Sequence, residues 1–238
     1  MSNSLFSEKK VQIFISEKSD GSMKLLGGFG DEKILDNRKI FLGKIGIDLQ
    51  DVVSADLEHG TKVEIVGKNE KGIFIKKTDG LVTKEKNIFL TVTVADCLPI
   101  FIYTETGVGI LHGGWRGVAD GVVENGIKKF KEMTNCLLEE IFLKVGPSID
   151  SCCFEVGNDV AEVFQKYSEA VQDENGRKFV DLKKVVQQIA LQEGLLEERI
   201  DISSECTACL PEKYFSFRRD KPEKVEAMMA GIGLVCRE

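Results

Sequence analysis

The chain has 238 residues but only two histidines, and each stands directly before glycine. His59 precedes one glycine and His112 precedes two. Glycine lets the backbone bend tightly, which leaves the neighbouring ring accessible. Cys97 follows an apolar stretch, and one thiolate with two imidazoles is a ligand set typical of catalytic zinc, which keeps its fourth position for water or substrate. The sequence therefore predicts a zinc site at His59, Cys97 and His112.

A different chemistry would use two of the same residues. The three ligands are far apart in the chain, unlike the local ligand pairs of a zinc finger. A nucleophilic Cys97 with His112 as its base needs only these two side chains. Both interpretations stay open on the spacing alone.

Three arginines are candidates for binding an anion. Arg116 lies in a Gly-Gly-Trp-Arg-Gly segment that leads into an expected helix, where free N–H groups and a planar guanidinium suit phosphate or carboxylate. The alternative is a surface arginine that covers Trp115. Arg218 and Arg219 end an expected strand over 214–220, so they should point to opposite faces, one toward a pocket and one toward a carboxylate. A solvated strand end fits them equally well.

Four further cysteines form two pairs along the chain. Cys152 and Cys153 are adjacent, which disfavours a disulfide between them, and we expect free thiols. Cys206 and Cys209 form one C-x-x-C motif. A structural zinc at this motif needs two more ligands, which the sequence does not identify, so we expect the pair to be structural.

Composition excludes several classes of protein. The net charge of −7 and the pI of about 5.2 disfavour long nucleic acid as a partner. The apolar stretch over 88–103 is interrupted by Asp96 and Pro99 and is shorter than the ~20 residues of a membrane-spanning helix. Residues 1–8 lack the pattern of a secretory signal, and the seven cysteines are odd in number. We expect a cytoplasmic protein with reduced thiols, and no membrane partner.

Hydrophobic periodicity predicts the elements that must position these residues. Strands are expected over 11–15, 88–95, 99–103 and 108–111, and helices over 31–41, 118–130, 156–167 and 182–189, the last with Asp181 as its N-cap. Strands and helices alternate with additional strand pairs. This order favours one α+β domain over residues 1–238, with mixed sheets flanked by helices.

Several short stretches follow one another in a specific order: Gly30-Asp31-Glu32, Asn37-Arg38, Glu58-His59-Gly60, Thr78-Asp79-Gly80-Leu81-Val82-Thr83, Ala95-Asp96-Cys97-Leu98-Pro99, the segment 112–117, Gly146-Pro147-Ser148-Ile149, Cys153-Phe154-Glu155-Val156 and the segment 215–220. Together they resemble the YfiH-type laccase-domain family, whose members are also described as purine nucleoside phosphorylases. The resemblance covers most of the chain and implies a sandwich-like, CNF/YfiH-like fold. The chain departs from the family pattern at Gly113 and Lys221, where alanine and glycine are usual.

The resemblance also implies a cofactor and an activity. It implies zinc held by His59, Cys97 and His112, phosphorolysis of adenosine, inosine and guanosine, and adenosine deamination as a second activity. The expected partners are therefore a small nucleoside and phosphate. The alternatives are a hydrolase or amidase that edits peptidoglycan precursors and a non-catalytic nucleotide-sensing module. A multicopper oxidase needs many imidazole ligands for about four coppers, and two histidines cannot supply them.

Overall fold

The computed structural model describes residues 10–24, 31–221 and 223–235, so Gly30 and the segment 1–8 lie outside the described residues. The strands are β1 (Val11–Ile15), β2 (Val52–Asp56), β3 (Val63–Ile65), β4 (Phe74–Lys76), β5 (Gly80–Thr83), β6 (Phe89–Val94), β7 (Leu98–Tyr103), β8 (Val108–Gly113), β9 (Phe142–Val145), β10 (Glu155–Val156), β11 (Val171–Glu174), β12 (Arg177–Val180), β13 (Ile200–Ile202) and β14 (Met228–Leu234). The helices are α1 (Glu32–Lys44), α2 (Trp115–Asp120), α3 (Val122–Thr134), α4 (Asn158–Val163), α5 (Leu182–Gln192) and α6 (Phe217–Asp220).

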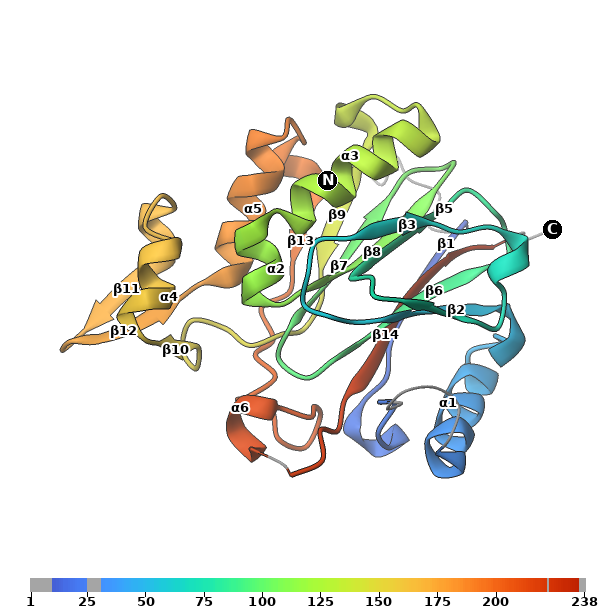
Figure 1. Ribbon diagram of the computed structural model, residues 1–238, viewed down its shortest axis with the longest axis horizontal. Helices are drawn as coiled ribbons and strands as arrows, with labels where there is room; N and C mark the ends of the chain where they lie inside the picture. The colour runs from blue at the N-terminus through green and yellow to red at the C-terminus, as the bar shows by residue number, and fades with distance from the viewer. Residues whose placement is uncertain (1–9, 25–30, 222, 236–238) are drawn as a thin grey trace, which may run out of the picture.

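Two large mixed sheets form the centre of the molecule (Figure 1). One has six strands in the order β13-β9-β7-β8-β5-β3, and the other has five in the order β1-β14-β6-β2-β4. Strand pairs such as β7 with β8 are antiparallel, while β2 with β6 and β9 with β13 are parallel. A smaller antiparallel sheet, β10-β12-β11, lies beside α4 at the left of Figure 1.

Three hydrophobic clusters fill the spaces between these layers. Helices α3 and α5 cover the outer face of the six-stranded sheet, and the two sheets pack against each other. Helix α1 packs against the other face of the five-stranded sheet. Strand β6 shows the alternation that permits this, because Leu90 and Val92 face the partner sheet whereas Phe89 faces the α1 side. The order of layers is therefore helix, sheet, sheet, helix.

The predicted α+β class with mixed sheets flanked by helices is confirmed. The strands expected over 11–15, 88–95, 99–103 and 108–111 correspond to β1, β6, β7 and β8. Two predicted helices correspond to α1 and α5. In α1, the Asp31 carboxylate caps the helix by accepting the N–H of Ile34, and in α5 the Asp181 carboxylate accepts the N–H of Lys184.

Two predicted helices differ from the structure. The helix expected over 118–130 is divided into α2 and α3 at Gly121, whose φ of 102° lies in the left-handed region and cannot continue a right-handed helix. The helix expected over 156–167 is wrong at both ends, because Val156 pairs with Lys178 in β10 and β12 and α4 ends at Val163. The apolar spacing there reflects burial rather than a continuous helix, since Phe164 is fully buried.

The strand expected over 214–220 is also wrong. Residues Phe217–Asp220 form the short helix α6 instead. The Ser216 hydroxyl accepts the N–H of Arg219, and the Ser216 N–H donates to the Asp220 carboxylate. These two local hydrogen bonds stabilise a helical turn over an extended strand. Lys221 ends the turn at a φ of 41°, the left-handed conformation that the glycine usual in the family adopts without strain.

None of the helices in the described part of the chain is long and apolar enough to cross a membrane.

We expect Asp181→Ala to lower the free energy of unfolding by about 1 kcal/mol, because the first turn of α5 loses its side-chain cap. Urea denaturation at a fixed metal concentration measures this change. The control is Asp36→Ala at an exposed position inside α1, where alanine should leave stability unchanged or raise it slightly. Equal losses in both variants would contradict the capping role.

Candidate metal centre

The three predicted ligands meet at one end of the sheet sandwich. His112 is the penultimate residue of β8, Cys97 occupies the turn between β6 and β7, and His59 lies in the loop after β2. Their ligand atoms all lie within 4.8 Å of one another. The two imidazole rings meet edge to face, with ring centroids 4.8 Å apart and an interplanar angle of 84°. His112 is buried, Cys97 is half-buried and His59 is exposed, so the group opens toward solvent on the His59 side.

A buried carboxylate for which the sequence predicted no role organises two of the ligands. Asp79, just before β5, is only 1 % exposed. It accepts backbone N–H groups from Glu58, His59 and Gly60 at 3.2, 2.9 and 2.8 Å. It also lies 2.9 Å from Nδ1 of His112. The loop that carries one ligand and the ring of another are therefore fixed by the same group.

The contact with Asp79 determines which nitrogen of His112 is free. An Nδ1–H donated to the carboxylate leaves Nε2 available, the arrangement in which an acidic residue orients a metal-binding histidine. Burial alone lowers the pKa of His112, but the charge of Cys97 and the hydrogen bond that His112 donates to Asp79 raise it to about 9. Burial likewise raises the pKa of Cys97, and the charges and hydrogen bonds of both histidines lower it to about 6. The pair thus favours a thiolate beside an imidazolium, and a metal ion would displace the shared proton.

Glycines in the segment after His112 allow the close approach of the ligands. A Cβ on Gly114 would lie 2.9 Å from the His59 ring and 3.5 Å from Sγ of Cys97. A Cβ on Gly117 would lie 2.7 Å from the carbonyl oxygen of Gly60. Helix α2 can therefore pack against the His59 loop only because these positions lack side chains.

The ligands line a cavity of about 420 Å³. This volume lies in the range of small-molecule sites. Its other walls carry aromatic and cationic side chains: Trp115, Phe154, Phe217, Lys24, Arg116 and Arg218. Such a lining suits a flat ring joined to an anionic group.

The position of Arg116 is consistent with both predicted roles, which are binding an anion and covering Trp115. Its guanidinium lies 4.4 Å from the Trp115 ring centroid, as a surface arginine covering the tryptophan would, yet both residues line the cavity. Among the described residues, no carboxylate forms an ion pair with Arg116. Stacking occupies the face of the guanidinium and leaves its N–H edges free to bind an anion.

Arg218 and Arg219 make different contacts in the structure. Arg218 lines the cavity, and its Nη1 donates to the carbonyl oxygens of Cys153 and Glu155 at 3.1 and 2.7 Å. Arg219 does not line the cavity. Its guanidinium donates to the carbonyls of Thr207 and Tyr214 and forms an ion pair with Asp220. These contacts consume the donors of Arg219, so they do not support its predicted phosphate-binding role.

Asp96, which precedes Cys97, is a second organising carboxylate. Its φ of 86° is unusual for a residue with a side chain. It accepts hydrogen bonds from the Thr207 hydroxyl at 2.6 Å, the Ser216 hydroxyl at 3.0 Å and the Arg218 N–H at 2.7 Å. Asp79 and Asp96 both lie in stretches that carry the family resemblance, but the sequence predicted no role for either carboxylate.

Comparison with known proteins agrees with this architecture. A family described as "Multi-copper polyphenol oxidoreductase laccase" matches residues 15–235. The chain belongs to this family. The crystal structure of the hypothetical protein YfiH of Bacillus licheniformis superposes with a TM-score of 0.88 at 29 % identity, over 94 % of this chain and 92 % of that one. The predicted YfiH-type family and fold are thereby confirmed.

Two curated relatives carry the names of enzymes. Purine nucleoside phosphorylase YlmD of Bacillus subtilis (strain 168) is 31 % identical over 86 % of this chain and 78 % of its own length. Adenosine deaminase RL5, from an unknown prokaryotic organism, is 29 % identical over 80 % of this chain and 79 % of its own length.

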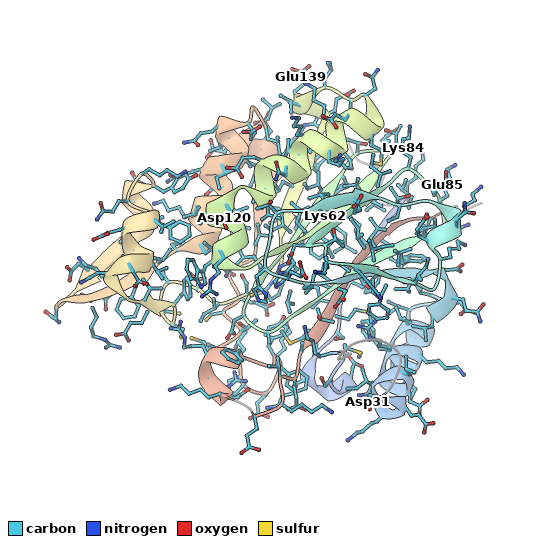
Figure 2. The ribbon with its side chains drawn as sticks, viewed as in Figure 1. Asp31, Lys62, Lys84, Glu85, Asp120 and Glu139 are labelled. Atoms are coloured by element: carbon cyan, nitrogen blue, oxygen red, sulfur yellow. The ribbon has the colours of Figure 1, made fainter. Side chains whose placement is uncertain are left out.

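We expect Asp79→Asn to weaken binding of added Zn²⁺ at this centre by about 10- to 100-fold, the usual effect of losing the partner that orients a histidine ligand. The NH₂ group of the introduced asparagine cannot accept the hydrogen bonds that the carboxylate accepts from the backbone N–H groups. Competition with a chromophoric chelator measures the affinity. Asp120→Asn, at an exposed residue that ends α2 (Figure 2), is the matched control. Equal affinities in both variants would show that Asp79 is not required to hold the ligands.

Proposed function

We propose that this protein is a zinc-dependent purine nucleoside phosphorylase that acts on adenosine, inosine and guanosine, with adenosine deamination as a second activity. The observation that carries this proposal is the convergence of His59, Cys97 and His112 on the wall of a cavity that also contains Arg116. The names of YlmD and of the RL5 deaminase support the two reactions.

The donor set fits zinc. Two imidazoles and one thiolate are ligands of the type found at catalytic zinc, and three protein ligands leave one position open. The contact between Asp79 and Nδ1 of His112 directs Nε2 toward the other ligands. When bound, zinc supplies an electrophile that can polarise an oxygen atom or lower the pKa of a bound water to about 7.

The residues of the chain supply binding and orientation. In phosphorolysis a phosphate oxygen forms a bond to C1′ of the ribose, and the bond to the purine nitrogen breaks with its electron pair going to the base. Phosphate must therefore be held beside the sugar while charge on the departing purine is stabilised. Arg116 presents a cation for the phosphate, and Trp115 presents an apolar ring against which a purine can stack.

The copper in the family's description does not carry over to a multicopper mechanism in this chain. Such a mechanism requires several copper ions and many imidazole ligands, whereas the full sequence has two histidines. Both are already used by the three-ligand centre.

A second candidate is a hydrolase or amidase that edits a peptidoglycan precursor, with Cys97 as the nucleophile. The observation in its favour is the chain of contacts from Cys97 to His112 to Asp79, which matches a thiol, its base and the acid that orients the base. This arrangement gives His59 no role, so we place it second. A non-catalytic nucleotide-sensing module would bind a nucleotide at the same cavity without turnover.

Incubating the protein with adenosine tests these candidates. We expect adenine and ribose-1-phosphate only when phosphate is present, and inosine with or without it. Cys97→Ala should reduce both reactions to below about 1 % of wild type, because two remaining ligands bind zinc weakly. Cys136→Ala, at a half-buried cysteine after α3, is the control and should retain both.

Chromatography of the products separates the outcomes. Normal deamination by Cys97→Ala would contradict the metal-dependent account. No reaction with adenosine, but cleavage of a muramyl-type amide, would replace the proposal with the second candidate.

Arg116→Lys should slow phosphorolysis by about 10-fold or more while changing deamination less, because an ammonium group cannot reproduce the planar two-point contact of a guanidinium with phosphate. The rate as a function of phosphate concentration is the measurement. Arg199→Lys is a matched control, since Arg199 also lies 4.4 Å from an aromatic ring centroid but does not line the cavity. An unchanged phosphate dependence in Arg116→Lys would return Arg116 to the role of a surface residue over Trp115.

A further inference from the structure

The two cysteine pairs that the sequence left unassigned come together in space. Cys152 and Cys153 lie in the turn between β9 and β10, and Cys206 and Cys209 lie in the loop between β13 and α6. Their four sulfur atoms all lie within 4.8 Å of one another. Cys152 and Cys153 therefore lie where the two further thiols that the C-x-x-C motif lacked would be needed.

The distances suit one ion at the centre of a tetrahedron. Sγ of Cys209 lies 3.4 Å from that of Cys153 and 3.6 Å from that of Cys152, and the adjacent pair is 3.7 Å apart. Four thiolates at about 2.3 Å from one zinc ion are about 3.8 Å from one another. A disulfide needs a separation of about 2.0 Å, and all four cysteines are free thiols here. A cluster of several irons distributes its cysteines over different metal atoms, so it would not draw all four to one point.

Hydrogen bonds from the backbone and from Lys183 hold the two loops together, and they do not require a metal ion. Ser148 and Cys206 form an isolated parallel bridge, and the Thr207 N–H donates to the Ser148 carbonyl at 3.1 Å. The buried Lys183 ammonium binds the Asp150 carboxylate at 2.9 Å and the carbonyls of Ser203 and Glu205 at 2.9 and 3.0 Å. One lysine on α5 thus connects the two loops, which keeps the cysteines close before a metal binds.

The burial of the four side chains leaves a route for an ion. Cys206 is buried and Cys153 is half-buried, whereas Cys152 and Cys209 are exposed. An ion can therefore arrive from solvent at the two exposed thiols. Four protein ligands leave no open position, so a site of this kind is structural rather than catalytic.

We propose that Cys152, Cys153, Cys206 and Cys209 bind one zinc ion, separate from the His59 centre, that crosslinks the loop leading into the cavity wall at Phe154 to the loop before α6. The first loop continues into Phe154, which lines the cavity. The second contains Thr207, whose hydroxyl donates to Asp96 beside Cys97. Arg218 and Arg219 donate to carbonyls of the first and second loop respectively. The crosslink therefore supports the position of the cavity wall and of the turn that carries Cys97.

Metal analysis of purified variants tests the proposal, and it does not depend on activity. Wild type should contain about two zinc ions per chain, His59→Ala should lose one, and Cys209→Ser should lose the other. Cys209→His should keep the ion, since imidazole also binds tetrahedral zinc. Cys136→Ser, outside the cluster, is the matched control and should keep both ions. If Cys209→Ser does not fold, the His59→Ala protein loaded with Co²⁺ should still show the absorption of a tetrahedral four-thiolate site.

Several results of these measurements would contradict the proposed four-cysteine zinc site. Unchanged zinc content in Cys209→Ser, a Co²⁺ spectrum without thiolate bands, or disulfides among the four cysteines in freshly purified protein would overturn the proposal. Iron in place of zinc would overturn the assignment of the ion. Zinc that is retained in His59→Ala but lost in Cys209→Ser would leave this proposal intact and count against the centre at His59, so the two failures are distinguishable.

Discussion

The carboxylate of Asp79 must remain charged and hydrogen-bonded below the surface, and the candidate metal centre depends on that constraint. A buried carboxylate is tolerated only when its oxygens are satisfied, and here three backbone N–H groups and the His112 ring satisfy them. The same contacts hold His59 at a φ of 60°, a left-handed conformation that costs roughly 1–2 kcal/mol in a residue with a side chain. One buried charge thus fixes the direction of one imidazole and the backbone of the other.

Asp96, which precedes Cys97 in the chain, is a second buried carboxylate whose hydrogen bonds hold a predicted ligand in place. It too is buried and in a left-handed conformation, and it gathers a threonine hydroxyl, a serine hydroxyl and the backbone N–H of Arg218. These donors all come from the segment after β13, far from Asp96 in the chain. The thiolate ligand is therefore held between its own strands and a distant loop, and that loop is one of the two that the cysteine cluster joins.

The sheet sandwich provides the rigid frame for these contacts. Strands β6, β7 and β8 are buried along nearly their whole length, so the turn at Cys97 and the end of β8 at His112 begin from fixed positions. The short helices α2 and α6 and the turn before β10 carry the arginines and the aromatic residues of the cavity. Arg219 of α6 shows that a charged residue near the cavity can serve the local structure instead, because its donors bind carbonyl oxygens and Asp220.

The sequence by itself determined the α+β class, four strands (β1, β6, β7 and β8), two helices and the grouping of His59, Cys97 and His112. Alternation and helical spacing are local signals, and the scarcity of histidine together with the family resemblance limited the choice of ligands. Only the tertiary structure decided that Asp79 joins two ligands, that the donors of Arg219 bind carbonyl oxygens and Asp220, and that the two cysteine pairs form one cluster. Each of these depends on segments distant in sequence that become neighbours when the sheets pack. The pattern of apolar residues also did not predict the break at Gly121 or the turn of α6. The break depends on the left-handed conformation of Gly121, and the turn depends on local hydrogen bonds of Ser216.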